Sequence, residues 1–238
     1  ETGIQKGENM KKYLMLKMIA LFAAIFLVFV VAVSAKAKQP YKGITYYVNG
    51  DAEGADNGSS WQDAFTDLQD ALAVAVPGDE IWVAAGTYKP HASNRSVSFS
   101  LKSGVKVYGG FEGDENVLHK RHLDPSLTVL SGNLGSVNSY HVVYANEVTD
   151  AVLDGFTVQD GRAETSYGGG MYTNESALTV SNCVFSDNQA EYGGGGMHNQ
   201  NSVLTVSDCI FSGNQVAINA SYGTVSYTHL TLPTKRIV

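Results

Sequence analysis

Two carboxylates and one cation lie close together in the middle of the chain, at Asp154, Asp160 and Arg162. Paired carboxylates are what glycoside hydrolysis uses, one as the acid and the other as base or nucleophile. A lyase would instead use the arginine as its base, beside carboxylates that hold calcium. The alternative is a structural role, because each aspartate precedes a glycine and aspartate favours turns. We favour the structural role, since no complete catalytic signature accompanies the three residues.

An acidic, glycine-rich stretch nearer the N-terminus could hold a cation. Asp51, Glu53, Asp56 and Asn57 supply hard oxygen ligands of the kind that calcium prefers. The stretch does not complete an EF-hand loop, because no ligand pair ends a run of about 12 residues. The alternative is a solvated turn rich in Asp and Asn. Calcium is the one cofactor that the sequence suggests.

Histidines occur in two further settings. The polar segment 112–124 contains the basic run 119–122, His-Lys-Arg-His, which could bind an acidic group but is more typical of a solvated loop outside the stack. His198 stands alone, at a repeat position where the neighbouring copy has Tyr172. We expect His198 on an exposed wall rather than among metal ligands.

Residues 168–219 contain the strongest pattern in the sequence, a tandem repeat of 26 residues. Two copies align without a gap and are identical at 14 of 26 positions. Both contain Gly-Gly-Gly-Met, Leu-Thr-Val-Ser and Cys-x-Phe-Ser-x-Asn-Gln. A fixed period of this size predicts stacked units, none of which can bury its apolar face alone.

The composition of the repeat indicates which type of solenoid it forms. Apolar residues alternate in short runs, first at Leu178 and Val180, then at Cys183 and Phe185. The phase slips by one residue between the runs, which predicts a corner that keeps the apolar side inward. The glycine triplets would break a helical repeat. We therefore predict an all-β fold, a right-handed single-stranded parallel β-helix over residues 78–223, with its handedness taken from the usual crossover bias.

Residues 41–77 are expected to cap the first coil. A strand at 44–48 and the acidic loop precede an amphipathic stretch, which predicts a helix over 61–76 with Ser60 as its N-cap. The apolar face of this helix consists of Trp61, Ala64, Phe65, Leu68, Ala71, Leu72, Ala75 and Val76. A strand and helix of this kind cover strand edges that could otherwise pair with other chains.

Two pairs of residues one period apart are expected to stack between coils. The phase places Cys183 and Cys209 inward, at about the inter-strand spacing of 4.8 Å. That distance permits a disulfide, but side chains stacked in register point alongside each other, which strains the preferred dihedral angle. We therefore predict two buried free thiols. Asn188 and Asn214 are expected to stack at a corner, where their amides can bond between coils.

The repeat also resembles a known family. Phe185-x-x-Asn188 and Phe211-x-x-Asn214, each following a Gly-Gly element, are similar to the FxxN and GGxx repeats of chlamydial polymorphic outer-membrane proteins and of bacterial surface proteins with right-handed β-helix repeats. The order of elements in residues 44–90 resembles the N-terminal module of pectate-lyase-like β-helix proteins. The resemblance implies a fold and a cell-surface setting, but no chemistry. The sequence lacks the Asp-Asp with Gly-His-Gly of polygalacturonases and the Arg-x-Pro-x-x-Arg of pectate lyases.

The two ends of the chain differ in composition from the rest. We interpret residues 1–9 as upstream sequence before a start at Met10. Residues 10–37 have a basic start, an apolar run and small residues at candidate cleavage sites, which predicts a secretory signal peptide. The alternative is an uncleaved membrane anchor, for which the apolar run is short. Residues 224–238 share nothing with the repeat and are predicted to be a non-native tail.

The charge of the region between these ends narrows the choice of partners. Residues 39–225 contain eight basic and 21 acidic residues, a net charge of −13. Nucleic acid is excluded as a partner because binding it requires clustered Lys and Arg. An anionic polysaccharide is disfavoured unless calcium bridges it.

These features together predict a secreted or cell-surface protein of a bacterium, either extracellular or on the outer membrane. We expect a non-catalytic role in adhesion, display or carbohydrate binding, with a carbohydrate or a host or cell-surface ligand as partner. We expect no transmembrane span in the mature part. A polysaccharide lyase or glycoside hydrolase is the alternative.

Overall fold

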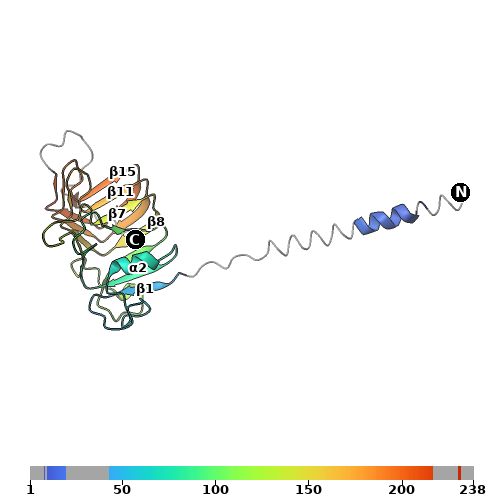
Figure 1. Cartoon of the computed structure of the whole chain (residues 1–238), viewed down its shortest axis with the longest axis horizontal. Helices are drawn as coiled ribbons and strands as arrows, with labels where there is room; N and C mark the ends of the chain where they lie inside the picture. The colour runs from blue at the N-terminus through green and yellow to red at the C-terminus, as the bar shows by residue number, and fades with distance from the viewer. Residues whose placement is uncertain (1–7, 9, 20–42, 217–229, 232–238) are drawn as a thin grey trace, which may run out of the picture. The chain divides into compact units, whose positions relative to one another are not determined.

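The computed structural model describes residue 8, residues 10–19, residues 43–216 and the backbone of residues 230–231 (Figure 1). The chain forms two compact units, Glu1–Tyr41 and Lys42–Val238. In the first unit, residues 10–19 are helical. No helix in the described parts of the chain is long and apolar enough to cross a membrane. Most of the predicted signal peptide and of the predicted tail lies outside the described residues.

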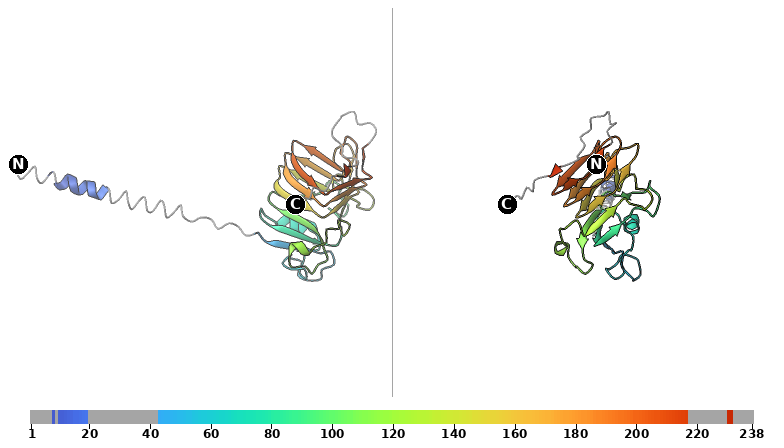
Figure 2. Two further views of the ribbon diagram at one scale, coloured as in Figure 1. Left: turned by 180° about the vertical axis from the view of Figure 1, so that it is seen from behind. Right: turned by 90° about the vertical axis from the view of Figure 1, so that its left-hand side faces the viewer.

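The second unit is a parallel β-solenoid of about five coils, in which strands of successive coils lie one above another (Figures 1 and 2). The prediction of an all-β parallel solenoid with one helix near its N-terminus is confirmed. Each coil crosses a wall called here sheet A, then sheet B, then sheet C, with a short corner sheet between B and C in the later coils. Because each wall is formed by residues one coil apart in sequence, side chains at equivalent repeat positions form columns along the stack.

The strands are short, as the repeat predicts. Sheet A consists of β1 (Thr45–Val48), β2 (Glu80–Ala84), β5 (Lys106–Phe111), β8 (Thr149–Asp154), β12 (Ala177–Ser181) and β16 (Val203–Ser207). Sheet B consists of β3 (Gly86–Tyr88), β6 (Thr128–Ser131), β9 (Thr157–Gln159), β13 (Val184–Ser186), β17 (Ile210–Ser212) and β19 (Leu230–Thr231). Sheet C consists of β4 (Phe99–Ser100), β7 (Val143–Asn146), β11 (Met171–Asn174) and β15 (Met197–Gln200). The corner sheet consists of β10 (Arg162–Ala163), β14 (Gln189–Ala190) and β18 (Gln215–Val216).

The register of the strands follows the sequence period. Val184 pairs with Ile210, which lies 26 residues later, and with Thr157, which lies 27 residues earlier. Every pairing between described strands is parallel except that of β19, which runs antiparallel to β17. The segment between β5 and β6 is longer than its counterparts and contains the short 3-10 helix η1 (Leu118–Lys120). This insertion lengthens the coil between β5 and β8, in which Val107 pairs with Leu153, 46 residues later.

The cap differs from its prediction in the length of its helix. The only helix described in the cap is α2 (Leu68–Val74), whereas the sequence predicts a helix over 61–76. Asp67, not Ser60, is the N-cap, since its side chain accepts a hydrogen bond from the backbone N–H of Gln69 at 2.8 Å. Leu68, Ala71 and Leu72 are buried, but Val76 lies beyond the helix and is 45% exposed.

The helix begins late because the preceding backbone is already used by β1. The N–H of Phe65 donates to the carbonyl of Tyr47, and the N–H of Asn49 donates to the carbonyl of Phe65, both at 2.9 Å. Asp56 also accepts from the N–H of Thr66 at 2.8 Å. Backbone groups engaged in this way cannot join a helical ladder, and tertiary contacts therefore override the amphipathic pattern.

The interior of the later coils is a stack of identical side chains. The rings of Phe185 and Phe211 lie 4.9 Å apart with their planes within 7°, and both are almost fully buried. Cys183 and Cys209 are buried beside them as free thiols, as the sequence predicts. Burial raises the pKa of the Cys183 thiol well above its ordinary value. Such a thiol packs as a small apolar side chain and stays un-ionised.

A ladder of buried amides closes the corner between sheet B and the corner sheet. Asn188 donates through Nδ2 to Oδ1 of Asn214 at 3.1 Å and to the carbonyl of Val158 at 2.9 Å. In the coil below, the N–H of Gly161 donates to Oδ1 of Asn188 at 2.9 Å. Gly170 passes so close to this ladder that a Cβ there would lie 2.8 Å from Nδ2 of Asn188. The prediction that Asn188 and Asn214 bond between coils is confirmed, and the close approach accounts for a glycine at position 170.

Leu68→Asp is expected to destabilise the cap by at least about 3 kcal/mol, because a fully packed side chain is lost and a charge is buried in its place. Leu68 is 1% exposed. The measurement is the free energy of unfolding from chemical denaturation. Val74→Asp, on the same helix at a position that is 46% exposed, is the matched control and should change stability little. Equal stability of the two variants would show that α2 is not packed against the first coil.

Thiol titration should find both cysteines unreactive in the native protein and both reactive after denaturation without a reductant. The physical reason is that Cys183 and Cys209 are buried and are not joined by a disulfide. Fewer than two thiols after denaturation would mean that the coils are cross-linked. Rapid reaction in the native state would contradict the inward placement.

Candidate functional site

The outward face of sheet C carries a column of aromatic side chains. Tyr144 of β7 pairs in register with Tyr172 of β11, which pairs with His198 of β15. Their neighbours Val143, Met171 and Met197 are buried. Because side chains alternate along a strand, the three rings point away from the core.

The rings of this aromatic column are offset rather than fully superposed. The planes of Tyr144 and Tyr172 lie within 8°, with ring centroids 5.8 Å apart, and Tyr172 and His198 lie 5.5 Å apart within 19°. Parallel rings at these separations adopt the offset-stacked arrangement. Tyr144 and Tyr172 are half-buried, in contrast to the enclosed phenylalanine stack inside. The column therefore stabilises the stacking of coils and still leaves aromatic surface to solvent.

His198 lies at the end of the column under a further ring. Tyr167 stacks on it with a centroid distance of 4.4 Å, and only 7% of His198 is exposed. His198 does lie on a wall of the solenoid, but the expectation that it is exposed there is wrong. The covering residue comes from the loop before β11, a contact that the position of His198 in the repeat does not reveal.

A second column, of amides, runs beside the aromatic column. Asn146, Asn174 and Gln200 end the same three strands in register, two residues after the rings. Nδ2 of Asn174 donates to Oδ1 of Asn146 at 2.9 Å, and the hydroxyl of Tyr172 donates to Oε1 of Gln200 at 2.6 Å. Sheet C therefore presents aromatic rings and hydrogen-bonding amides in parallel rows.

A cavity of about 260 Å³ adjoins the aromatic column through His141. His141 lies 5.3 Å from the ring of Tyr172, and its Nδ1 lies 2.8 Å from the carbonyl oxygen of Gly168. Since a carbonyl only accepts hydrogen bonds, Nδ1 is the donor and carries the proton. The cavity is lined by Ser96, Tyr140, His141, Glu164, Thr165 and Ser166.

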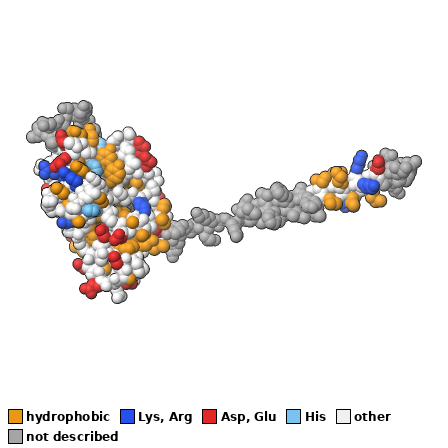
Figure 3. All heavy atoms as spheres, viewed as in Figure 1, with side chains coloured by type: hydrophobic (Ala, Val, Ile, Leu, Met, Phe, Trp, Pro, Cys, Tyr) orange, Lys and Arg blue, Asp and Glu red, His pale blue; other side chains and the backbone are white. Residues whose placement is uncertain are grey.

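Charged side chains of both signs lie at this cavity and form ion pairs with one another. Arg95 pairs with Glu164 at 2.8 Å, and Arg162 pairs with the same carboxylate at 3.2 Å. Glu191 accepts a hydrogen bond from the N–H of Thr165 at 2.9 Å. Figure 3 shows hydrophobic and histidine side chains gathered on the face toward the viewer and Lys and Arg side chains at its border. Glu164 is the one carboxylate among the lining residues, and it is paired with both arginines.

Both histidines of this face are neutral near pH 7. Burial lowers the pKa of His141, and its hydrogen bond to the Gly168 carbonyl offsets this only in part. Burial also lowers the pKa of His198, and the nearby His141 lowers it further. No side chain of the aromatic or amide column is then charged.

Asp154, a catalytic candidate from the sequence, is enclosed by partners. Arg121 contacts its Oδ1 at 2.5 Å, and the side chains of the two residues are 7% and 13% exposed. The hydroxyl of Ser181 donates to Oδ2 at 2.6 Å, and Asn182 reaches both oxygens at 3.1 and 3.2 Å. Through Arg121, this ion pair holds the segment 112–124 against the end of β8. The interpretation of the run 119–122 as a solvated loop is thus wrong for Arg121, whose partner lies 33 residues away.

The other two catalytic candidates have partners of their own. Asp160 accepts hydrogen bonds from Ser131 and Gln159, both at 3.0 Å, and has the positive φ angle of 62° typical of a turn. Arg162 pairs with Glu164 in the corner sheet. No contact joins Asp154, Asp160 and Arg162 to one another among the described interactions. Their predicted role as catalytic residues remains a hypothesis.

The acidic loop does not assemble its four candidate ligands. Asp56 accepts hydrogen bonds from Thr66, and Asn57 accepts one from the N–H of Ser59 at 3.0 Å. Asp51 and Glu53 line a cavity with Trp61 and its neighbours. Within the described residues, no group of three or more His, Cys, Asp or Glu is placed to hold a metal ion. Calcium binding by this loop stays a prediction without a site.

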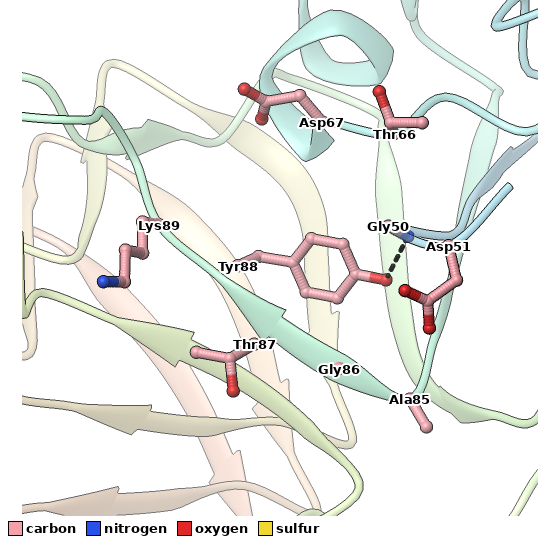
Figure 4. Close-up of a pocket in the computed structure, with 9 residues that line it drawn as sticks. All are labelled: Gly50, Asp51, Thr66, Asp67, Ala85, Gly86, Thr87, Tyr88 and Lys89. Carbon is pink, nitrogen blue, oxygen red and sulfur yellow. Dashed lines mark hydrogen bonds between the residues drawn. The ribbon is translucent and has the colours of Figure 1, made fainter.

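A second cavity, of about 410 Å³, lies between the acidic loop, the start of α2 and β3 (Figure 4). Figure 4 shows the Tyr88 ring extending toward Gly50 and Asp51. The Tyr88 hydroxyl accepts a hydrogen bond from the N–H of Gly50 at 3.4 Å and donates one to the carbonyl of Ala84 at 3.1 Å. Burial raises the pKa of Tyr88 to about 12, so the phenol stays protonated. Its hydroxyl therefore ties the cap loop to the first coil.

A family model described as a protein of unknown function, DUF1565, matches residues 48–235. The chain belongs to the DUF1565 family. The matched region of this DUF1565 chain includes both candidate faces, the aromatic column and the Tyr88 cavity. No curated protein and no solved structure matches the chain. The resemblance to polymorphic outer-membrane and pectate-lyase-like proteins therefore stays a prediction beyond the shared solenoid architecture.

The aromatic column of this DUF1565 chain is not among the features predicted from the sequence. The signal was present in part, because Tyr172 and His198 occupy one repeat position. Tyr144 lies 28 residues before Tyr172, so it does not fall on the 26-residue period. Its strand, β7, contributes the third residue of each column. Only the strand register shows that the three residues share a face.

The stability of this DUF1565 chain is expected to fall on acidification from about pH 8 to about pH 5, in part through His198. The folded state holds the pKa of His198 below the ordinary 6.5, so the unfolded chain binds the proton first as the pH drops through 6.5. His198→Tyr, which repeats the residue at position 172, should reduce this loss relative to the parent. Denaturation curves at several pH values test this, and identical pH dependence in both proteins would contradict it.

Proposed function

We propose that this protein is a non-catalytic, secreted or cell-surface β-solenoid that binds carbohydrate on the outward face of sheet C. The observation that carries the proposal is the half-exposed rings of Tyr144 and Tyr172, beside the amide column and next to Tyr167, which covers His198. Sugar rings have apolar faces that pack on aromatic rings and hydroxyl groups that hydrogen-bond to amides. This combination is supplied here by a rigid wall, which lowers the ordering cost of binding.

The charge distribution favours a neutral glycan over the other partners. The region 39–225 is strongly acidic, which disfavours nucleic acid and anionic polysaccharides. The two columns themselves are uncharged. A neutral polysaccharide is not repelled by the acidic surface and needs no cation to bridge it to the protein.

A polysaccharide lyase or glycoside hydrolase is the second candidate from the sequence. Its residues would be Asp154, Asp160 and Arg162. The oxygens of Asp154 are engaged by Arg121, Ser181 and Asn182, and that engagement favours a fastening role over acid–base chemistry. We therefore expect no turnover of pectate, alginate or neutral glucans by the full chain, measured as reducing ends or unsaturated products. Turnover that is lost on Asp154→Asn would overturn the non-catalytic assignment.

Binding should be tested with the full chain against a panel of neutral and anionic polysaccharides. We expect retention on one or more neutral glucans and loss of at least about tenfold in affinity for the double variant Tyr144→Ser and Tyr172→Ser. Thr179→Ser with Thr205→Ser, on the outward face of sheet A, is the matched control and should bind as the parent does. Binding unaffected by the sheet C variant, or binding to proteins alone, would contradict the proposal.

A further inference from the structure

The geometry points to the form of the glycan: we infer that the face of sheet C takes an extended, unbranched neutral chain lying along the solenoid axis, across three coils. This inference rests on the proposed function and adds the class and the direction of the ligand. It comes from the register of the strands, the spacing of the rings and the neutrality of both columns.

The direction follows from the register. Tyr144, Tyr172 and His198 are aligned across three neighbouring strands, so the line joining them runs perpendicular to the strands and along the stack. Neighbouring strands are about 4.8 Å apart. Ring centroids are 5.8 and 5.5 Å apart along the column. A glycan chain that advances by about one sugar per coil meets an aromatic ring and an amide at each step.

The length of the ligand follows from the ends of the column. In the coil below Tyr144, the register position is Ser100, which has no ring. At the other end, Tyr167 covers His198 at 4.4 Å and leaves it 7% exposed. The available aromatic surface is therefore that of Tyr144, Tyr172 and the covering Tyr167. These three rings limit the number of sugars whose binding can be strengthened by stacking.

The absence of branches follows from the borders of the face. On one side the rings adjoin the His141 cavity, where Glu164 is paired with Arg95 and Arg162, and Arg95 also lies over the Tyr140 ring at 4.2 Å. On the other side lies the amide column, whose groups bond along the axis, as between Asn174 and Asn146. A linear chain fits between these two rows, with its hydroxyls toward the amides.

The surface does not suit a peptide ligand. The backbone of β11 is paired on both sides, by β7 and β15, so an extended peptide cannot add a strand there. An amphipathic helix requires an apolar groove, whereas one of the two columns on this face consists of amides. A glycan uses rings and amides together and needs no free backbone.

The test measures affinity as a function of chain length, with linear neutral gluco-oligosaccharides of two to six sugars as the probes and the full-length protein as the receptor. Affinity should rise by about tenfold or more up to three or four sugars and then level off. Raising the salt concentration should change it little, because no net charge is involved. Gln200→Ala should flatten the length dependence by removing the amide of the last rung, while Tyr172→Ser should weaken all lengths.

The outcomes separate this inference from the proposed function. Binding of the polymer that depends on Tyr144 and Tyr172 but has the same affinity for two and six sugars would overturn the axial arrangement and leave carbohydrate binding intact. Steady strengthening with no plateau would also overturn it, since three rungs cannot supply it. If the unmutated, folded protein binds no glycan of the panel, both proposals are removed. Preference for branched over linear oligosaccharides would contradict the linear ligand.

Discussion

The structure depends on the in-register stacking of one coil on the next, and the buried amide ladder fixes that register. Asn188 bonds to Asn214 above it and to the backbone of Val158 and Gly161 below. A polar corner enclosed in an apolar core must find its hydrogen bonds inside the protein, or lose the free energy of hydration. A slip of one residue would leave these amides without partners and would turn every inward side chain outward. The ladder therefore selects a single register for all the walls.

The same register also produces the proposed binding face on sheet C. Once Phe185 lies over Phe211 inside the core, equivalent positions on sheet C must also lie over one another. Inside, the stacked rings are enclosed and only stabilise the fold. Outside, the rings of Tyr144 and Tyr172 stabilise the stack and remain half-exposed. A solenoid can thus display a row of repeated groups on a rigid wall without a dedicated loop.

Buried charged side chains attach two segments of this protein to the stack. The Arg121–Asp154 pair joins an insertion to the end of β8, with both side chains largely buried. Such a pair contributes less to net stability than its contacts suggest, because both charges must be desolvated, but the loss of one partner is costly. It specifies where the long insertion lies. Asp79, fully buried, similarly accepts hydrogen bonds from the backbone of Ile44 and Val76 and joins the cap strand to the first coil.

The sequence by itself determined the repeat, the all-β parallel solenoid, the inward cysteines and the amide ladder, because these depend on residues one period apart and on local alternation. The tertiary structure alone decided where the cap helix begins, since Phe65 pairs with β1 instead of joining the helix. It also decided that Arg121 is buried against Asp154 and that Tyr167 covers His198. In each case the deciding partner is distant or aperiodic, and neither local propensity nor a fixed period contains information about such a contact.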